Sequence, residues 1–173
     1  MNRSSGVLLH ISSLPGDYSV GSLGASARAF VDFLRDCGFS YWQILPTTEV
    51  DEVGSPYRSP SAFAGNPYFI DLDELCKIGL LTRSDLAAAR QNSPYLCEFE
   101  RLSKERLPLL RRAFLRIDDD VKNKIEAFRE ANPWLENYAE FMALRDENSG
   151  AAFNKWNEIK FKKEIISLVL QYT

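Results

Sequence analysis

Two short apolar runs, Gly6-Val-Leu-Leu-His-Ile11 and Phe39-Ser-Tyr-Trp-Gln-Ile-Leu45, decide the fold that the sequence predicts. Both have the length and the branched or aromatic content typical of buried strands. Between them, apolar residues recur at helical spacing from Gly24 to Cys37, and Gly38 provides a stop signal. A strand, a helix and a strand in this order form a βαβ unit, which predicts parallel strands joined by a right-handed crossover.

The segment that follows the second strand is the best candidate for a binding site. Residues 47–68 contain several prolines and glycines and show no sustained period, and compact domains rarely keep such a loop without a use for it. The loop follows the carboxyl end of a strand, where parallel α/β folds bind ligands. Its aromatic rings, hydroxyls and amide suit sugars. From composition alone, a proline-rich surface loop whose aromatic residues fill the core remains the alternative.

His10, the single histidine, ends the first strand on the same predicted edge as the loop. Its alternatives are a ligand contact and a half-buried imidazole bonded to backbone. Sites built from two or three histidine ligands are excluded. The acidic run Asp118-Asp-Asp120 is interpreted as the charged start of a helix, because it lacks the glycine and the terminal glutamate of a calcium loop. We therefore predict no metal and no cofactor. Trp42, in the second strand, is predicted to belong to the core.

The chain after the loop reads as helical. A short helix is expected over 72–78, and the Thr82-x-x-Asp85 pattern resembles a capping box that opens another. Pro108 lies inside a longer helical pattern and is expected to kink or divide it. Asn132-Pro133 fits an N-cap followed by proline at the first helical position. The last apolar pattern, up to Tyr172, carries no stop signal, so we expect the chain to be cut within it.

Composition bounds the class of protein. The 173 residues are enough for one sizeable core, and the formal net charge is −3 with acids and bases interspersed. The sequence has no basic face that would neutralise phosphates, so nucleic acid is not expected as a partner. No apolar run approaches the roughly 20 residues of a membrane span. A cytoplasmic protein without a membrane partner is the expectation. The three cysteines are widely spaced and are predicted to be small buried apolar residues.

Four motifs in order resemble the 4-α-glucanotransferases, also called amylomaltases or disproportionating enzymes (glycoside hydrolase family 77). The quoted stretches are Gly6-Val-Leu-Leu-His-Ile-Ser-Ser-Leu-Pro-Gly16, Tyr41-Trp-Gln-Ile-Leu-Pro46, Ser55-Pro-Tyr-Arg-Ser-Pro-Ser-Ala-Phe-Ala-Gly-Asn-Pro-Tyr-Phe-Ile-Asp-Leu72 and Asn132-Pro-Trp-Leu-Glu-Asn-Tyr-Ala-Glu-Phe-Met-Ala-Leu144. The resemblance covers nearly all of the chain. It implies the N-terminal part of a (β/α)₈ TIM barrel, contributing the first two parallel strands, with a mostly helical inserted subdomain.

The resemblance also implies a division of the chain. Residues 1–72 would begin the barrel and carry a long sugar-site loop at 47–70. Residues 73–150 would form the helical insertion. Residues 151–173 would return as a helix that is truncated before the third barrel strand. A full barrel needs about 250 residues, so the remaining strands are expected on a missing C-terminal portion, which is a candidate partner.

The activity that the resemblance implies is a retaining transfer of α-1,4-glucan segments between maltooligosaccharides or starch- and glycogen-derived glucans. Tyr57 would line the donor sugar site, Ser55 would shape the same turn, and Asn66 and His10 complete the predicted substrate-binding set. The essential carboxylates follow later strands in the family, so no catalytic residue is assigned here and the chain alone is expected to be inactive. The alternative is a non-catalytic glucan-binding or split-enzyme subunit.

Overall fold

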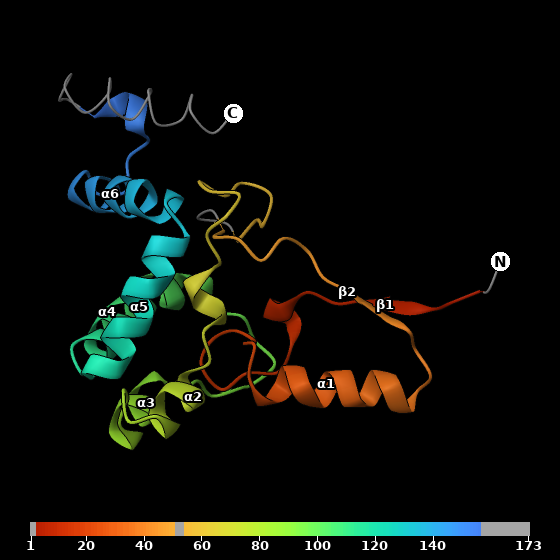
Figure 1. The fold of residues 1–173 in the computed structure, drawn as a ribbon. Helices are drawn as coiled ribbons and strands as arrows, with labels where there is room; N and C mark the ends of the chain where they lie inside the picture. The colour runs from red at the N-terminus through yellow and green to blue at the C-terminus, as the bar shows by residue number, and fades with distance from the viewer. Residues whose placement is uncertain (1–2, 51–53, 157–173) are drawn as a thin grey trace. The chain divides into compact units, whose positions relative to one another are not determined.

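The computed structural model describes residues 3–50 and 54–156. The chain divides into two compact units, one up to Asp118 and one from Asp119 onward. The elements of the first unit are traced in Figure 1. They are β1 (Gly6–Leu8), η1 (Ile11–Ser13), α1 (Ala25–Asp36), β2 (Tyr41–Gln43), η2 (Pro67–Phe69), α2 (Leu72–Lys77), α3 (Arg83–Ala89) and α4 (Phe99–Phe114).

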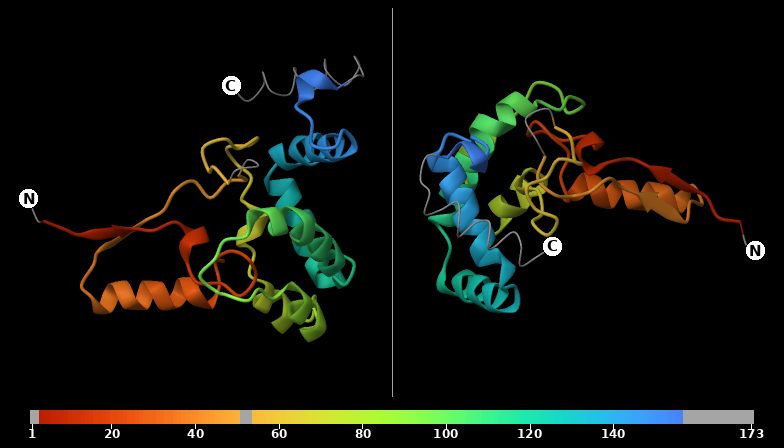
Figure 2. Two further views of the ribbon diagram at one scale, coloured as in Figure 1. Left: turned by 180° about the vertical axis from the view of Figure 1, so that it is seen from behind. Right: turned by 90° about the horizontal axis from the view of Figure 1, so that it is seen from above.

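The expected βαβ unit is confirmed, with shorter strands than the apolar runs indicated. β1 and β2 pair in parallel, with Val7 opposite Trp42, and α1 runs alongside both strands in each view of Figures 1 and 2. Pairing ends once the Leu9 amide has donated to the carbonyl oxygen of Gln43 at 3.0 Å, because the chain then turns into η1. The expected first strand up to Ile11 was therefore too long.

Trp42 of β2 packs between the strand pair and α1, as predicted for a core residue. Its ring meets that of Phe30 edge-on with centroids 5.0 Å apart. Its indole N–H donates to the carbonyl oxygen of Leu9 at 2.7 Å, so the polar end of the ring is also satisfied.

Two apolar clusters form the core of the first unit. One gathers Ile11 and Val20 from the segment after β1, Phe69 from η2 and Leu102 from α4. The other packs Leu72 of α2 against helix α4 and the turn before α3. Because α4 contributes to both clusters, it holds the end of the long loop against the segment that follows β1. At roughly 2 kcal/mol for each fully buried large side chain, these contacts position the loop end firmly.

The capping box at the start of α3 is confirmed. The Thr82 hydroxyl accepts from the Asp85 amide at 3.2 Å, and the Asp85 carboxylate accepts from the Thr82 amide at 2.9 Å. The same carboxylate accepts hydrogen bonds from Arg112 of α4 at 2.8 Å and from Arg116, just after α4, at 2.7 Å. The hydrogen bonds from Arg116 and Thr82 hold the pKa of Asp85 well below its usual range.

This cluster predicts a pH-dependent stability difference. Because the folded-state pKa of Asp85 is lowered, its stabilising effect is fully present above the unfolded value of about 4 and is lost as the pH falls toward the folded value. We expect Asp85→Asn to lower Tm clearly at pH 7, and the gap from the parent chain to narrow below about pH 4. Thermal melts between pH 7 and pH 3 check this; a gap that stays constant would contradict it.

Two helix expectations can be compared with the structure. Of the two outcomes expected at Pro108, a kink or a division, the division is excluded, because α4 is continuous from Phe99 to Phe114 with the proline inside it. Helix α6 (Trp134–Glu147) has Pro133, not Asn132, at its N-cap. The Asn132 side chain instead donates to the carbonyl oxygen of Phe128 at 2.8 Å, so it closes the end of the preceding helix.

The cysteine expectation was also wrong. Cys37 and Cys97 are exposed, and Cys76 is half-buried. Cys37 lies at the C-cap of α1, where the chain leaves the packed helix face, so the helical spacing that suggested burial no longer applies.

The second unit contains α5 (Asp119–Ala131), α6 and the short helix η3 (Phe153–Lys155). Asp119 and Asp120 lie in the first turn of α5, which confirms the acidic run as a helix start. Trp156 is buried, and its ring lies tilted against that of Phe141 with centroids 5.7 Å apart. Its indole N–H donates to the carbonyl oxygen of Ala151 at 2.8 Å. Most of the returning helix predicted over 151–173 lies outside the described residues.

Candidate functional site

The long loop presents Tyr57 to solvent on a frame of serine turns. The Tyr57 side chain is 71% exposed, and its amide donates to the Ser55 hydroxyl at 3.4 Å. Further along, the Ser61 hydroxyl accepts from the Ala64 amide at 3.1 Å, and Ser59 donates to the Ser61 carbonyl oxygen at 2.8 Å. Such hydroxyl-to-backbone bonds replace regular secondary structure and give a loop a defined path.

The start of this loop segment is fixed at helix α4. Gly54 has φ +80°, a backbone conformation that residues with a Cβ rarely adopt. A Cβ built there would lie 2.8 Å from the ring of Phe99, so the backbone passes close over that ring. Glycine is therefore required at this position both for its backbone angle and for the space available.

The far end of the loop is anchored by Asn66. Its backbone N–H donates to the carbonyl oxygen of Thr47 at 2.8 Å, beside an antiparallel bridge between Thr48 and Gly65. Its side-chain oxygen accepts from the Tyr68 amide at 2.9 Å and caps η2. The side chain is only 5% exposed, and its Nδ2 has no hydrogen-bond partner within the described residues.

His10 lies at the carboxyl end of β1, 9% exposed. Its ring meets Phe69 of η2 edge-on, with centroids 5.3 Å apart. Neither ring nitrogen has a hydrogen-bond partner in the part of the chain that the structure describes, so the alternative of an imidazole bonded to backbone is not what this structure contains. Burial lowers the pKa of His10, so the ring is neutral at pH 7.

The four predicted sugar-contact residues thus form two pairs. Ser55 and Tyr57 share one turn near the exposed part of the loop. His10 and Asn66 both adjoin η2, one by ring contact and one as its cap. Their roles toward a sugar stay predictions.

Asp71, which was not among the predicted site residues, joins the loop end to the start of α1. One carboxylate oxygen accepts from the Glu74 amide at 2.9 Å and so caps α2. The other accepts from the Ser22 hydroxyl at 2.6 Å. A Cβ at Gly24, the N-cap of α1, would lie only 1.6 Å from that oxygen, so glycine leaves the space that the carboxylate fills.

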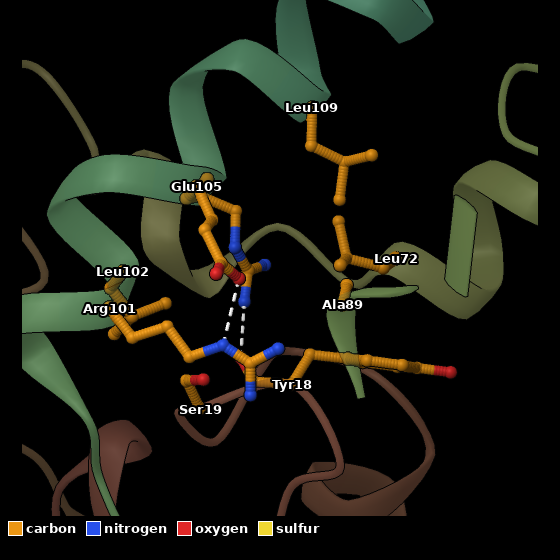
Figure 3. A pocket seen from close by; sticks show the side chains of 9 residues that line it. Tyr18, Ser19, Leu72, Ala89, Arg101, Leu102, Glu105 and Leu109 are labelled. Atoms are coloured by element: carbon orange, nitrogen blue, oxygen red, sulfur yellow. Dashed lines mark hydrogen bonds and ion pairs between the residues drawn. The ribbon is translucent and has the colours of Figure 1, made fainter. Parts of the chain in front are cut away.

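Two hollows beside this junction differ in size. Figure 3 shows the smaller, about 20 Å³, between the Tyr18–Ser19 segment and α4, with the Arg101–Glu105 ion pair among the side chains that line it. That volume accommodates one water molecule. The larger, about 220 Å³, lies over Tyr18, Asp71 and the start of α1. Neither is lined by Tyr57, His10, Ser55 or Asn66.

Within residues 3–50 and 54–156, no three histidine, cysteine or acidic side chains gather in a group suited to a metal ion. Among the described helices, none combines the length and the apolar character that crossing a membrane requires.

A parallel βαβ start followed by helices and a serine- and proline-rich loop defines a mixed α/β protein with a candidate ligand edge. The 4-alpha-glucanotransferase family, glycoside hydrolase family 77, matches residues 9–169. The chain therefore belongs to the 4-alpha-glucanotransferase family. This confirms the resemblance carried by its four motifs.

Individual relatives agree with the family match. The 4-alpha-glucanotransferase of Streptococcus pneumoniae is 42% identical over 173 residues, which cover 98% of this chain and 34% of the relative. That of Thermus thermophilus is 41% identical, covering 89% of this chain and 31% of the relative. The amylomaltase from Streptococcus agalactiae in complex with acarbose superimposes with a TM-score of 0.86 at 36% identity, covering 91% of this chain and 32% of that one. The chain spans about a third of the length of these relatives.

Proposed function

We propose that this chain is the glucan-binding front of a 4-α-glucanotransferase, holding the first two strands of a (β/α)₈ barrel and the loop 47–70 that contacts the donor sugar. The observation that carries the proposal is the exposed Tyr57 ring in a described segment, residues 54–70, that passes close to Phe99 at its start and is capped by Asn66 near its end. An exposed aromatic face on a rigid frame packs against the C–H face of a sugar without first being ordered. Residues 73–150 would then be the helical insertion, and 151–173 the return toward the barrel.

The ligand class follows from the family and from its solved relative. The Streptococcus agalactiae amylomaltase is described in complex with acarbose. We therefore assign α-1,4-glucans and maltooligosaccharides as ligands of this chain, with Tyr57 and Ser55 contacting the sugar. His10 and Asn66 complete the proposed sugar-contact set; the His10 ring nitrogens and the Asn66 Nδ2 are buried and have no hydrogen-bond partner among the described residues.

A retaining glucan transfer needs a carboxylate nucleophile about 5 Å from a carboxylic acid that protonates the leaving oxygen. The acid then takes a proton from the incoming sugar hydroxyl. No residue of this chain is assigned to either role, because the family motifs that carry them are absent from its sequence. Transfer of α-1,4-glucan segments is accordingly proposed for the assembled enzyme, and the chain alone is proposed to be inactive.

Incubation of the chain with maltotriose tests this division of labour. We expect no glucose and no longer oligomers by chromatography, even at high protein concentration, because the acid and the nucleophile are both lacking. Turnover that persists through purification and disappears with Tyr57→Ala would show that the chain holds its own catalytic carboxylates, and the proposal would fall.

A second candidate is a non-catalytic glucan-binding or split-enzyme subunit that finds its remaining strands on another polypeptide. The exposed apolar side chains of the strand pair favour it: Leu8 is 58% exposed and Tyr41 65% exposed. Strand edges and apolar faces of this kind are normally covered by further strands. Mixing the chain with a polypeptide that carries the missing portion discriminates the two: recovered glucan transfer indicates a split enzyme. A cytoplasmic location remains a prediction.

A further inference from the structure

Arg106 is the most deeply buried cation among the described residues of the first unit, and the proposed function gives it no role. It lies in the middle of α4 and is 4% exposed. Burial lowers the pKa of Arg106 to about 10, although the nearby Asp71 carboxylate opposes that effect. The side chain remains charged at pH 7.

The guanidinium of Arg106 holds two separate segments through their backbones. One Nη–H donates to the carbonyl oxygen of Ile70 at 3.1 Å, at the end of the loop that bears Tyr57. The other donates to the carbonyl oxygen of Tyr18 at 2.6 Å, in the segment that leads from His10 to α1. These are the two segments that carry the proposed sugar contacts.

The same two segments touch each other directly beside Arg106. The Leu23 amide donates to the carbonyl oxygen of Phe69 at 3.0 Å, and the Ser22 hydroxyl donates to the Asp71 carboxylate. Arg106 therefore adds two hydrogen bonds to a junction that the Leu23–Phe69 and Ser22–Asp71 bonds also hold. A buried charge gains little net stability over an apolar side chain of similar size, whereas a planar fork bonded to two fixed carbonyls defines relative position.

We propose that Arg106 is a positioning residue for the glucan site: it sets the place of residues 54–70 relative to the segment after His10, and thereby the pose of Tyr57. The inference rests on the proposed function for its consequence in sugar binding, but its structural part is measurable without any sugar. Lysine is a single compact donor group and is expected to keep only part of the effect.

The test compares Arg106→Met and Arg106→Lys with the parent chain, and Arg112→Met serves as the matched control from the same helix. The Arg112 side chain is 53% exposed and forms an ion pair with Asp85 in the first turn of α3. Hydrogen exchange of the Leu23 amide reports the junction, and the Asp85 amide reports the fold. In Arg106→Met we expect exchange at Leu23 to rise about tenfold or more while Asp85 stays protected.

Maltooligosaccharide titration supplies the second readout. We expect Arg106→Met to weaken binding about tenfold, Arg106→Lys to fall between it and the parent, and Arg112→Met to leave both Leu23 exchange and binding unchanged. If Arg106→Met fails to fold, Arg106→Lys carries the test with smaller effects of the same sign. Unchanged Leu23 exchange, or lost protection with unchanged affinity, overturns the inference. A parent chain that binds no glucan overturns the proposed function instead, while Leu23 exchange still reports the positioning.

Discussion

Replacing Asp71 with alanine is expected to lower the free energy of unfolding by about 3 kcal/mol. The carboxylate caps α2 through the Glu74 amide and also accepts the Ser22 hydroxyl. Removing it leaves both donors unpaired and opens the space beside Gly24. It also removes the nearest carboxylate that favours the buried charge of Arg106.

Asp73→Ala is the matched control for this prediction, since Asp73 lies in the same first turn of α2. Within the part of the chain that the structure describes, its carboxylate accepts only the exposed Tyr18 hydroxyl, at 2.9 Å, so we expect a loss below about 1 kcal/mol. Urea denaturation of both variants measures the difference. Equal losses would mean that Asp71 acts only as an ordinary helix cap and does not join the loop end to α1.

Replacing Tyr57 with alanine is expected to weaken maltooligosaccharide binding by about tenfold or more, the largest effect on function that we predict. The ring is 71% exposed in the free chain, so its removal deletes contact with a sugar and not packing within the protein. The free energy of unfolding should accordingly change by less than about 0.5 kcal/mol.

Two variants separate ring stacking from other causes. Tyr57→Phe keeps the aromatic face, so it should retain most of the affinity and lose only what the hydroxyl contributes. Tyr95→Ala removes another exposed ring, 82% exposed and outside loop 47–70, and should leave binding unchanged. Calorimetric titration of the four proteins checks the pattern. Equal weakening by Tyr57→Ala and Tyr95→Ala would indicate nonspecific sugar contact with exposed rings.

Local patterns predicted most of the secondary structure in this chain. The βαβ order, the extent of α1 and the capping box at Thr82 follow from spacing and from residue types that act within a few positions. The ends of β1 and β2 did not, because strand length depends on which backbone groups find partners across the sheet, and here pairing stops at Gln43. The undivided α4 shows tertiary packing overriding the local cost of Pro108.

The candidate site was predictable only in part, because bonds between residues far apart in the sequence leave no local pattern. Tyr57 and Asn66 stand in a motif that the sequence displays, whereas the cap that Asp71 provides for α2 was not predicted. The second bond of Asp71, to Ser22, spans 49 positions. Among the described residues, Arg106 bonds only to backbone carbonyls, at separations of 36 and 88 positions, and carbonyls leave no side-chain signature in a sequence.

The most direct measurement is a titration of the isotopically labelled chain with maltotetraose, followed by amide NMR. If loop 47–70 receives the glucan, saturable shift changes should centre on Ser55 and Tyr57, extend to Asn66 beside η2, and leave the Asp85 corner unmoved. Saturable changes that avoid the loop, or no saturable change up to millimolar sugar, would contradict the assignment of this edge as a glucan site.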